Sequence, residues 1–264
     1  MSLTASHKST HQPANLSTDR LINYLLSLAD SNLILSQKNA EWCGHGPVLE
    51  QDIALTNITL DLLGQARNFY QYAAALITAS TGKQATEDSL AYLRTEREFK
   101  NLLLCELPNG DWAQSILKLF FFSVYAQQLY TQLIHGSDEH IAAIAQKSLK
   151  ETNYHVRWSG EWVVRMGDGT EESNSRLKKA LDYLWPFTGE MFVAADFENE
   201  SNLASIKEKW QQQVQAVFEE ATILLPDMNT VMQTGGKQGV HTEHMGYILA
   251  EMQYLQRAYP GAEW

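Results

Sequence analysis

The chain has 264 residues, enough for one large domain or two small ones, and either could bury a sizeable core. Hydrophobic residues make up 44% of it and charged residues 19%, which excludes a globally disordered protein. The net charge of −11 and the lack of a Lys/Arg-rich run disfavour nucleic acid or an anionic membrane as a partner, because both bind cationic surfaces.

The amino-terminal stretch MSLTASHKSTHQPANLSTD is polar and lacks the apolar core of a signal peptide. No apolar run approaches the roughly 20 residues that are needed to cross a bilayer. Cys43 and Cys105 lie far apart and outside any C-x-x-C spacing, as expected of two reduced thiols. We therefore expect a cytoplasmic protein in which residues 1–16 form a flexible tail and residues 17–264 form a single domain.

Apolar periodicity predicts helices along nearly the whole chain. The first helix should run from Thr18, a suitable N-cap, to Lys38, where the segment NAEWCGHGPVLEQD ends it with two glycines and a proline. The second should open near Pro47 and continue to Thr78. Further helices are expected over residues 87–105, 111–134, 138–166, 171–185, 202–224 and 240–257, with loops over 186–201 and 226–239.

Four long helices with short connections predict an all-α, up-down bundle with additional carboxy-terminal helices. Positions spaced alternately three and four apart should face its core. Each such stripe is apolar except for polar interruptions, which fall at Asn32, Gln65, Ser123, Thr152 and His155. Our hypothesis is that these side chains meet in one buried polar layer, since a buried polar group left unpaired costs about 1–3 kcal/mol. The alternative is that backbone or water satisfies each one separately.

The stretch LKETNYHVRW resembles half of a di-iron site, which takes a Glu-x-x-His from each of two helices and one carboxylate from each of the other two. Glu151, however, comes one residue too early, and both it and Asp61 lie about 100° off their stripes. His155 is then the one inward-facing metal ligand, which cannot hold two irons. The pattern indicates a bundle laid out for a di-iron centre without its ligands, so we assign no catalytic, cofactor-binding or metal-binding residue to this chain.

Two long segments also resemble a known family. They are EWCGHGPVLEQDIALTNITLDLLGQARNFYQYAAAL (residues 41–76) and GGKQGVHTEHMGYILAEMQYLQRAYPGAEW (residues 235–264), and the likeness extends from about residue 20 to the end. Both are similar to the C subunits of bacterial phenylacetyl-CoA epoxidases, multicomponent monooxygenases of aerobic phenylacetate breakdown. The resemblance implies a ferritin-like bundle that serves as the structural partner of a related, catalytic di-iron subunit. It also implies a complex with further subunits, in which a separate reductase supplies electrons from NADPH and one oxygen atom enters the aromatic ring to give an epoxide.

Comparison with that catalytic relative assigns positions in this chain. LDLLGQARNFY is similar to its QDEAGHGLYLY, which sets Leu62 and Gln65 at the Glu and His of the first Glu-x-x-His. KETNYHVR is similar to its KEESFHQR, which sets Thr152 and His155 at the second pair. Asn32 and Ser123 then occupy the two single carboxylate positions. The resemblance thus implies six degenerate di-iron ligand positions, of which His155 alone keeps its identity.

Three other motifs invite a functional interpretation. HTEH (residues 241–244) could suggest zinc but has no further ligand nearby, so we expect it to cap a helix or contact another chain, with Thr242 or His241 near the N-cap. TGGKQG (residues 234–239) lacks the spacing of a phosphate loop and should be an ordinary loop. CGHG (residues 43–46) has no orienting acid and should be a tight turn.

Three functions from different classes follow. The first is a non-catalytic structural subunit that binds and stabilises the catalytic di-iron subunit, with no cofactor of its own and an extended apolar and aromatic face that is also available for self-association. The second is a metal-binding oxygenase subunit with displaced ligands Asp61, Glu151 and His155, which would need a local distortion such as a π-bulge. The third is a small-molecule binding bundle that uses a vestigial cavity.

Overall fold

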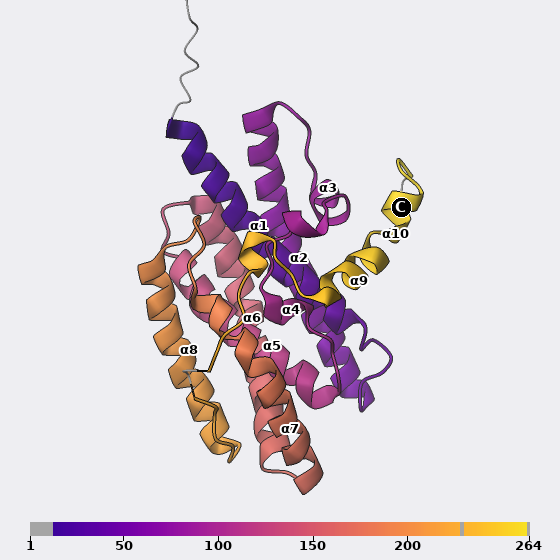
Figure 1. Cartoon of the computed structure of the whole chain (residues 1–264), viewed down its shortest axis with the longest axis vertical. Coiled ribbons are helices and arrows are strands. Elements are labelled where there is room, and N and C mark those ends of the chain that lie inside the picture. The colour runs from indigo at the N-terminus through magenta and orange to yellow at the C-terminus, as the bar shows by residue number, and fades with distance from the viewer. Residues whose placement is uncertain (1–12, 228–229, 263–264) are drawn as a thin grey trace, which may run out of the picture.

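The computed structural model describes residues 13–227 and 230–262 (Figure 1). Side chains are described from Thr18 onward. This part of the chain forms ten α-helices and four short 3-10 helices and contains no strand. The long helices are α1 (Pro13–Ala40), α2 (Leu49–Thr81), α5 (Trp112–Leu133), α6 (Glu139–Gly167), α7 (Glu171–Leu184) and α8 (Glu200–Glu220). The short ones are α3 (Glu87–Tyr92), α4 (Leu103–Glu106), α9 (Glu243–Met252), α10 (Tyr254–Ala258), η1 (Glu96–Glu98), η2 (Trp185–Phe187), η3 (Gly189–Phe192) and η4 (Gly236–Gln238).

The four longest elements of the predicted bundle, α1, α2, α5 and α6, pack as two antiparallel pairs. Helix α1 lies along α2, α5 lies along α6, and α2 contacts α6, so that one core runs between them. Helices α7 and α8 cover α5 and α6. This arrangement confirms the all-α, ferritin-like bundle expected from the sequence.

Side-chain caps fix where several helices begin. The carboxylates of Asp111 and Asp138 accept hydrogen bonds from the N–H groups of Gln114 and Ile141, at 3.1 and 3.0 Å. The bundle helices α5 and α6 therefore start where the sequence predicts. Helix α1, in contrast, begins at Pro13, and the predicted tail falls mainly on residues 1–12, which lie outside the described residues.

The helix predicted over residues 87–105 is wrong, because that segment is broken into α3, η1 and α4. Its middle part is held by groups from α1. The N–H of Lys100 donates to Asp30 Oδ2 at 2.7 Å, and the N–H of Leu102 donates to Ser31 Oγ at 3.1 Å. These tertiary bonds take the place of helical ones, which a local periodicity cannot reveal.

Asp30 is the centre of that attachment and has no exposed surface. Its carboxylate accepts hydrogen bonds from both terminal nitrogens of Arg94, one of them at 3.1 Å, and from the Tyr70 hydroxyl at 2.5 Å. Burial opposes the charge on Arg94, but the adjacent Asp30 outweighs burial and raises the pKa of the guanidinium. The guanidinium also lies 4.2 Å from the centre of the Phe99 ring. A fully bonded ion pair thus joins α1 and α2 to the segment after α3.

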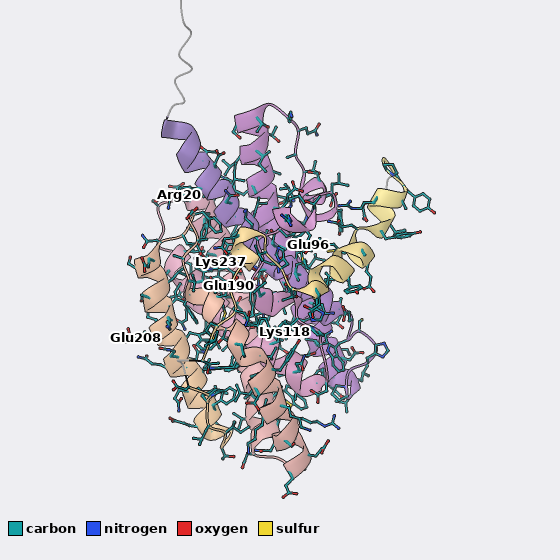
Figure 2. All side chains as sticks on the ribbon, in the orientation of Figure 1. Arg20, Glu96, Lys118, Glu190, Glu208 and Lys237 are labelled. Atoms are coloured by element: carbon teal, nitrogen blue, oxygen red, sulfur yellow. The ribbon has the colours of Figure 1, made fainter. Side chains whose placement is uncertain are left out.

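The segment before α9, residues 235–242, is fastened to the core through buried carboxylates. Glu190 accepts hydrogen bonds from the N–H groups of Leu103, Gly235 and Gly236 at 2.6–2.8 Å. Lys237, which is 2% exposed, donates to Glu198 at 2.7 Å. Glu190 and Lys237 lie close together in the middle of the molecule (Figure 2). The predicted loop over residues 226–239 is therefore anchored at its end.

The other predicted helices exist with shifted ends. The helix expected over residues 202–224 ends at Glu220, because Thr222 takes a left-handed conformation with φ of 57° and Ile223 N–H bonds back to the Phe218 carbonyl oxygen. The helix expected over residues 240–257 begins at Glu243 and is divided at Gln253 into α9 and α10. Gln253 donates its side-chain amide to the carbonyl oxygens of Ala91 and Arg94, which ties this division to the end of α3.

Candidate functional site

The six positions singled out by the sequence all lie inside the four-helix bundle. Each is 1% exposed, and they come from every long helix of the bundle: Asn32 from α1, Leu62 and Gln65 from α2, Ser123 from α5, and Thr152 and His155 from α6. Their flanking stripe residues, such as Leu25, Ile58, Ile116 and Ala145, are buried as well. The spacing of three and four therefore identified the inward faces correctly.

A chain of hydrogen bonds runs through part of this layer. Asn32 Nδ2 donates to the Tyr130 hydroxyl at 3.1 Å, and that hydroxyl donates to Gln65 Oε1 at 3.1 Å. Gln65 Nε2 in turn donates to Glu151 Oε2 at 3.0 Å. The chain passes from α1 through α5 and α2 to α6, so it links all four helices.

Tyr130 is the junction of that chain and was not among the polar residues that the sequence singled out. It stands on the inward stripe of α5, where its ring counts as apolar, and the ring stacks 6.2 Å from that of Phe69. Burial raises the pKa of the Tyr130 hydroxyl, so the group stays protonated and can donate. The signal was present in the sequence, because a buried Tyr needs a partner for its hydroxyl.

His155 is turned away from the chain of hydrogen bonds. Its Nε2 lies 3.0 Å from Asp61 Oδ2, a carboxylate whose side chain is 35% exposed at the edge of the bundle. Ser123 Oγ and Thr152 Oγ1 are buried and make no hydrogen bond. The single layer expected from the sequence is therefore made only in part: Asn32 and Gln65 share a network, His155 forms a separate pair, and two hydroxyls are left over.

The layer is a poor donor set for metal. Among residues 13–227 and 230–262, no three His, Cys, Asp or Glu side chains stand together where they could hold a metal ion. The displaced ligands of the oxygenase alternative are not gathered, since Asp61 faces His155 while Glu151 bonds to Gln65. Helix α6 is α-helical throughout Glu139–Gly167, without the π-bulge which that alternative needs.

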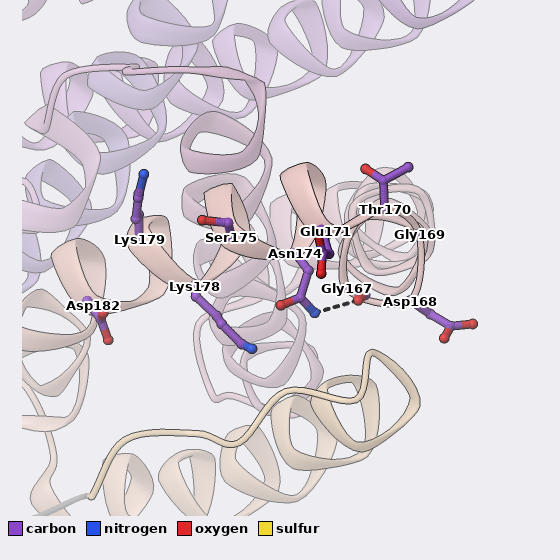
Figure 3. Close-up of a pocket in the computed structure, with 10 residues that line it drawn as sticks. All are labelled: Gly167, Asp168, Gly169, Thr170, Glu171, Asn174, Ser175, Lys178, Lys179 and Asp182. Atoms are coloured by element: carbon purple, nitrogen blue, oxygen red, sulfur yellow. Dashed lines mark hydrogen bonds between the residues drawn. The ribbon is translucent and has the colours of Figure 1, made fainter.

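Two hollows in the described structure bear on the small-molecule hypothesis. The hollow beside Asn32 and Tyr130 holds about 10 Å³, roughly the space of one water molecule. A larger pocket lies at the corner between α6 and α7 and is open to solvent (Figure 3). Its Lys178 and Lys179 side chains point in different directions, and its drawn hydrogen bond joins Asn174 to the Gly167 carbonyl oxygen. Neither feature favours the small-molecule hypothesis.

The HTEH motif caps helix α9 and places His241 against the buried carboxylate of Glu106. Thr242 is the N-cap of α9 and accepts a hydrogen bond from the N–H of His244, as expected. Both ring nitrogens of His241 face acceptors: Nδ1 lies 2.8 Å from Glu106 Oε2, and Nε2 lies 3.1 Å from the Phe99 carbonyl oxygen. Burial alone would lower the pKa of His241, but Glu106 outweighs it and raises the pKa above the usual 6.5. The motif attaches α9 to α4.

The two remaining motifs are structural. CGHG is a turn in which the N–H of Gly44, at a φ of 83°, donates to both carboxylate oxygens of Asp52. TGGKQG is a loop whose backbone N–H groups bind the protein's own Glu190, as described above. The exposed Cys43 thiol of CGHG has Gly44 and Asp52 fixed in a turn beside it, and the N–H groups of TGGKQG are taken by a carboxylate of the protein rather than by a phosphate.

Two comparisons with known proteins bear on the family of the chain. Residues 3–264 match the family model described as phenylacetic acid catabolic protein. The chain is also 45% identical over 253 residues to the C subunit of the 1,2-phenylacetyl-CoA epoxidase of Escherichia coli (strain K12), an alignment that covers 93% of this chain and all of that protein. No helix among the described residues has the length and apolar character to span a membrane.

Proposed function

The chain belongs to the phenylacetic acid catabolic protein family, and on that premise we propose that it is the C subunit of a phenylacetyl-CoA epoxidase. In this proposal the chain is non-catalytic: it binds and stabilises the catalytic di-iron subunit in a cytoplasmic complex for aerobic phenylacetate catabolism. The other subunits would include a reductase that draws electrons from NADPH. The full-length similarity to the C subunit of such an epoxidase supports the assignment.

One observation carries the non-catalytic role. The six inward positions that a di-iron bundle uses for its ligands hold an amide pair, two hydroxyls, a leucine and one imidazole, all buried. Carboxylate oxygens are the ligands that hold both irons in such sites, and none of these six residues has one. The chemistry of this donor set does not fit a di-iron centre.

The hydrogen bonds of the layer suggest what this chain does instead. A di-iron centre links the four helices of its bundle through shared ligands. Here the chain from Asn32 through Tyr130 and Gln65 to Glu151 links the same four helices through neutral side chains and one carboxylate. The subunit can therefore present fixed helices to its partner without a metal to order them, and oxygen activation is left to the partner.

The experiment is a comparison of this chain alone with the chain co-expressed with the catalytic subunit. We expect far less than one iron per isolated chain by elemental analysis, no oxidation of phenylacetyl-CoA by that chain, and activity in the co-expressed complex. An iron content near one per isolated chain that is lost in the His155→Ala variant would refute the non-catalytic role. That result would instead support a metal site at the Asp61–His155 pair. Failure to form any complex would refute the assignment as a subunit.

A further inference from the structure

The outward face of α2 carries a row of large apolar side chains that remain exposed in the described chain. Leu49, Ile53, Leu60 and Leu63 are 70, 53, 58 and 42% exposed. With Thr56 between them, they follow the spacing 4-3-4-3 along the helix. That spacing averages 3.5 residues, the repeat with which one helix packs along another. The row covers 15 residues, or about 21 Å of helix.

Gly64 lies beside Leu60 and Leu63, and no contact or backbone angle within this chain requires a glycine at that position. It stands in the interior of α2, where glycine destabilises a helix, and a Cβ built there meets no atom within 4 Å. Its φ is not positive, so no turn or left-handed backbone requires it. A position that is small, costly to the helix and next to exposed leucines suits the close approach of another helix from outside.

The charge of the chain indicates what that helix belongs to. Two copies of a chain with a net charge of −11 repel each other, which opposes a dimer through this face. The first turn of α2 adds Glu50 and Asp52 at the end of the row, so a helix with basic side chains at that end would be favoured. A different chain therefore fits the face better than a second copy does.

We propose that the row Leu49, Ile53, Leu60 and Leu63, with Gly64 at the point of closest approach, docks against a helix of the catalytic subunit. The inference rests on the proposed function, and it adds the surface that carries it. The partner helix should have an apolar seam of the same repeat, with a small residue opposite Gly64 and Lys or Arg toward Glu50. No residue of the polar layer takes part, because that layer faces the opposite side of α2.

The test uses the full chain, the purified catalytic subunit and two variants that act in different ways. Leu60→Glu places a charge in the row, and Gly64→Leu adds bulk at the proposed contact while removing a helix-destabilising glycine. Leu224→Glu is the matched control, since Leu224 is 92% exposed after α8 and lies off the row. Binding is measured by titration of the catalytic subunit, and folding by thermal unfolding of each chain alone.

We expect both α2 variants to weaken binding by about 30-fold or more, the loss typical of a hot-spot residue. The control should bind like the wild type, and Gly64→Leu should unfold at the same temperature as the wild type or above it. Wild-type affinity in both α2 variants would overturn the docking face while leaving the subunit assignment intact. If wild-type chains do not bind the catalytic subunit, the proposed function itself fails. An isolated chain that is dimeric, and that Leu60→Glu makes monomeric without affecting the complex, would assign the face to a second copy and overturn the proposal.

Discussion

Replacement of Asp30 by asparagine should be among the most destabilising single substitutions in this chain. Asp30 has no exposed surface and Arg94 is 8% exposed, so Asp30→Asn leaves a guanidinium buried without its counter-charge. Removal of one partner of a buried ion pair costs about 3–5 kcal/mol. For a protein of this length each kcal/mol lowers the melting temperature by about 2–4 °C, so a fall of about 6–20 °C is expected.

The assay is thermal and urea unfolding of the chain alone, followed by far-UV circular dichroism at fixed protein concentration. Arg94→Met in the Asp30→Asn background removes the stranded charge, so the double variant should be much more stable than the sum of the single effects predicts. Glu172→Gln is the control, because Glu172 pairs with Arg176 on the exposed surface of α7, and it should change nothing measurable. A loss below about 1 kcal/mol for Asp30→Asn, or additive effects in the double variant, would refute the view that this pair is buried and coupled.

Three further predictions concern other buried groups. Tyr130→Phe removes the hydroxyl between Asn32 and Gln65 and should cost about 1–3 kcal/mol in urea unfolding, whereas Ser123→Ala should be neutral because Ser123 Oγ has no partner; equal losses would contradict this view of the layer. Burial, with a smaller contribution from a nearby lysine, lowers the pKa of Lys118 to about 7, so between that value and its usual 10.5 the unfolded chain holds a proton that the folded chain lacks. Stability should therefore rise with pH in that range by up to about 1.4 kcal/mol per unit, and Lys118→Met should abolish the rise; an unchanged slope in the variant would exclude Lys118 as its source. The pKa of His241 is raised, so its contribution to stability is complete below pH 6.5 and is lost as the pH rises through the higher folded value. Hydrogen exchange of α9, corrected for intrinsic rates, should then lose protection with rising pH in the wild type but not in His241→Gln, and equal pH dependence in both would contradict the role of the His241 pair.

The inward faces of the long helices could be predicted because one physical rule governs them. A helix in a bundle buries every third or fourth residue, and the positions of Asn32, Gln65, Ser123, Thr152 and His155 followed from that spacing alone. The starts of α5 and α6 could be predicted as well, because the caps at Asp111 and Asp138 act locally.

The contacts between distant residues could not be predicted in this way. Residues 93–102 leave the helical path because Asp30 and Ser31, some 70 positions earlier, bind their backbone N–H groups. The direction in which His155 points depends on Asp61 of another helix, and a stripe gives only the face on which a residue lies. Tyr130 lies on an otherwise apolar stripe of α5, and that stripe does not reveal that its hydroxyl joins Asn32 of α1 to Gln65 of α2. Each of these misses comes from a polar partner that is remote in sequence.

The way in which residues 235–242 are fastened has a consequence for synthesis of the chain. Glu106 accepts a hydrogen bond from the N–H of Thr242, 136 positions later in the chain. Glu190 accepts hydrogen bonds from the N–H groups of Gly235 and Gly236, 45 and 46 positions later. While the last thirty or so residues are still being synthesised, the four bundle helices have already been made, but Glu106 has only its hydrogen bond from Asn101 and Glu190 only its hydrogen bond from Leu103. Burial of either carboxylate at that stage carries a penalty. A chain cut short before residue 235 therefore retains acidic groups in its interior that lack the hydrogen bonds from Gly235, Gly236 and Thr242.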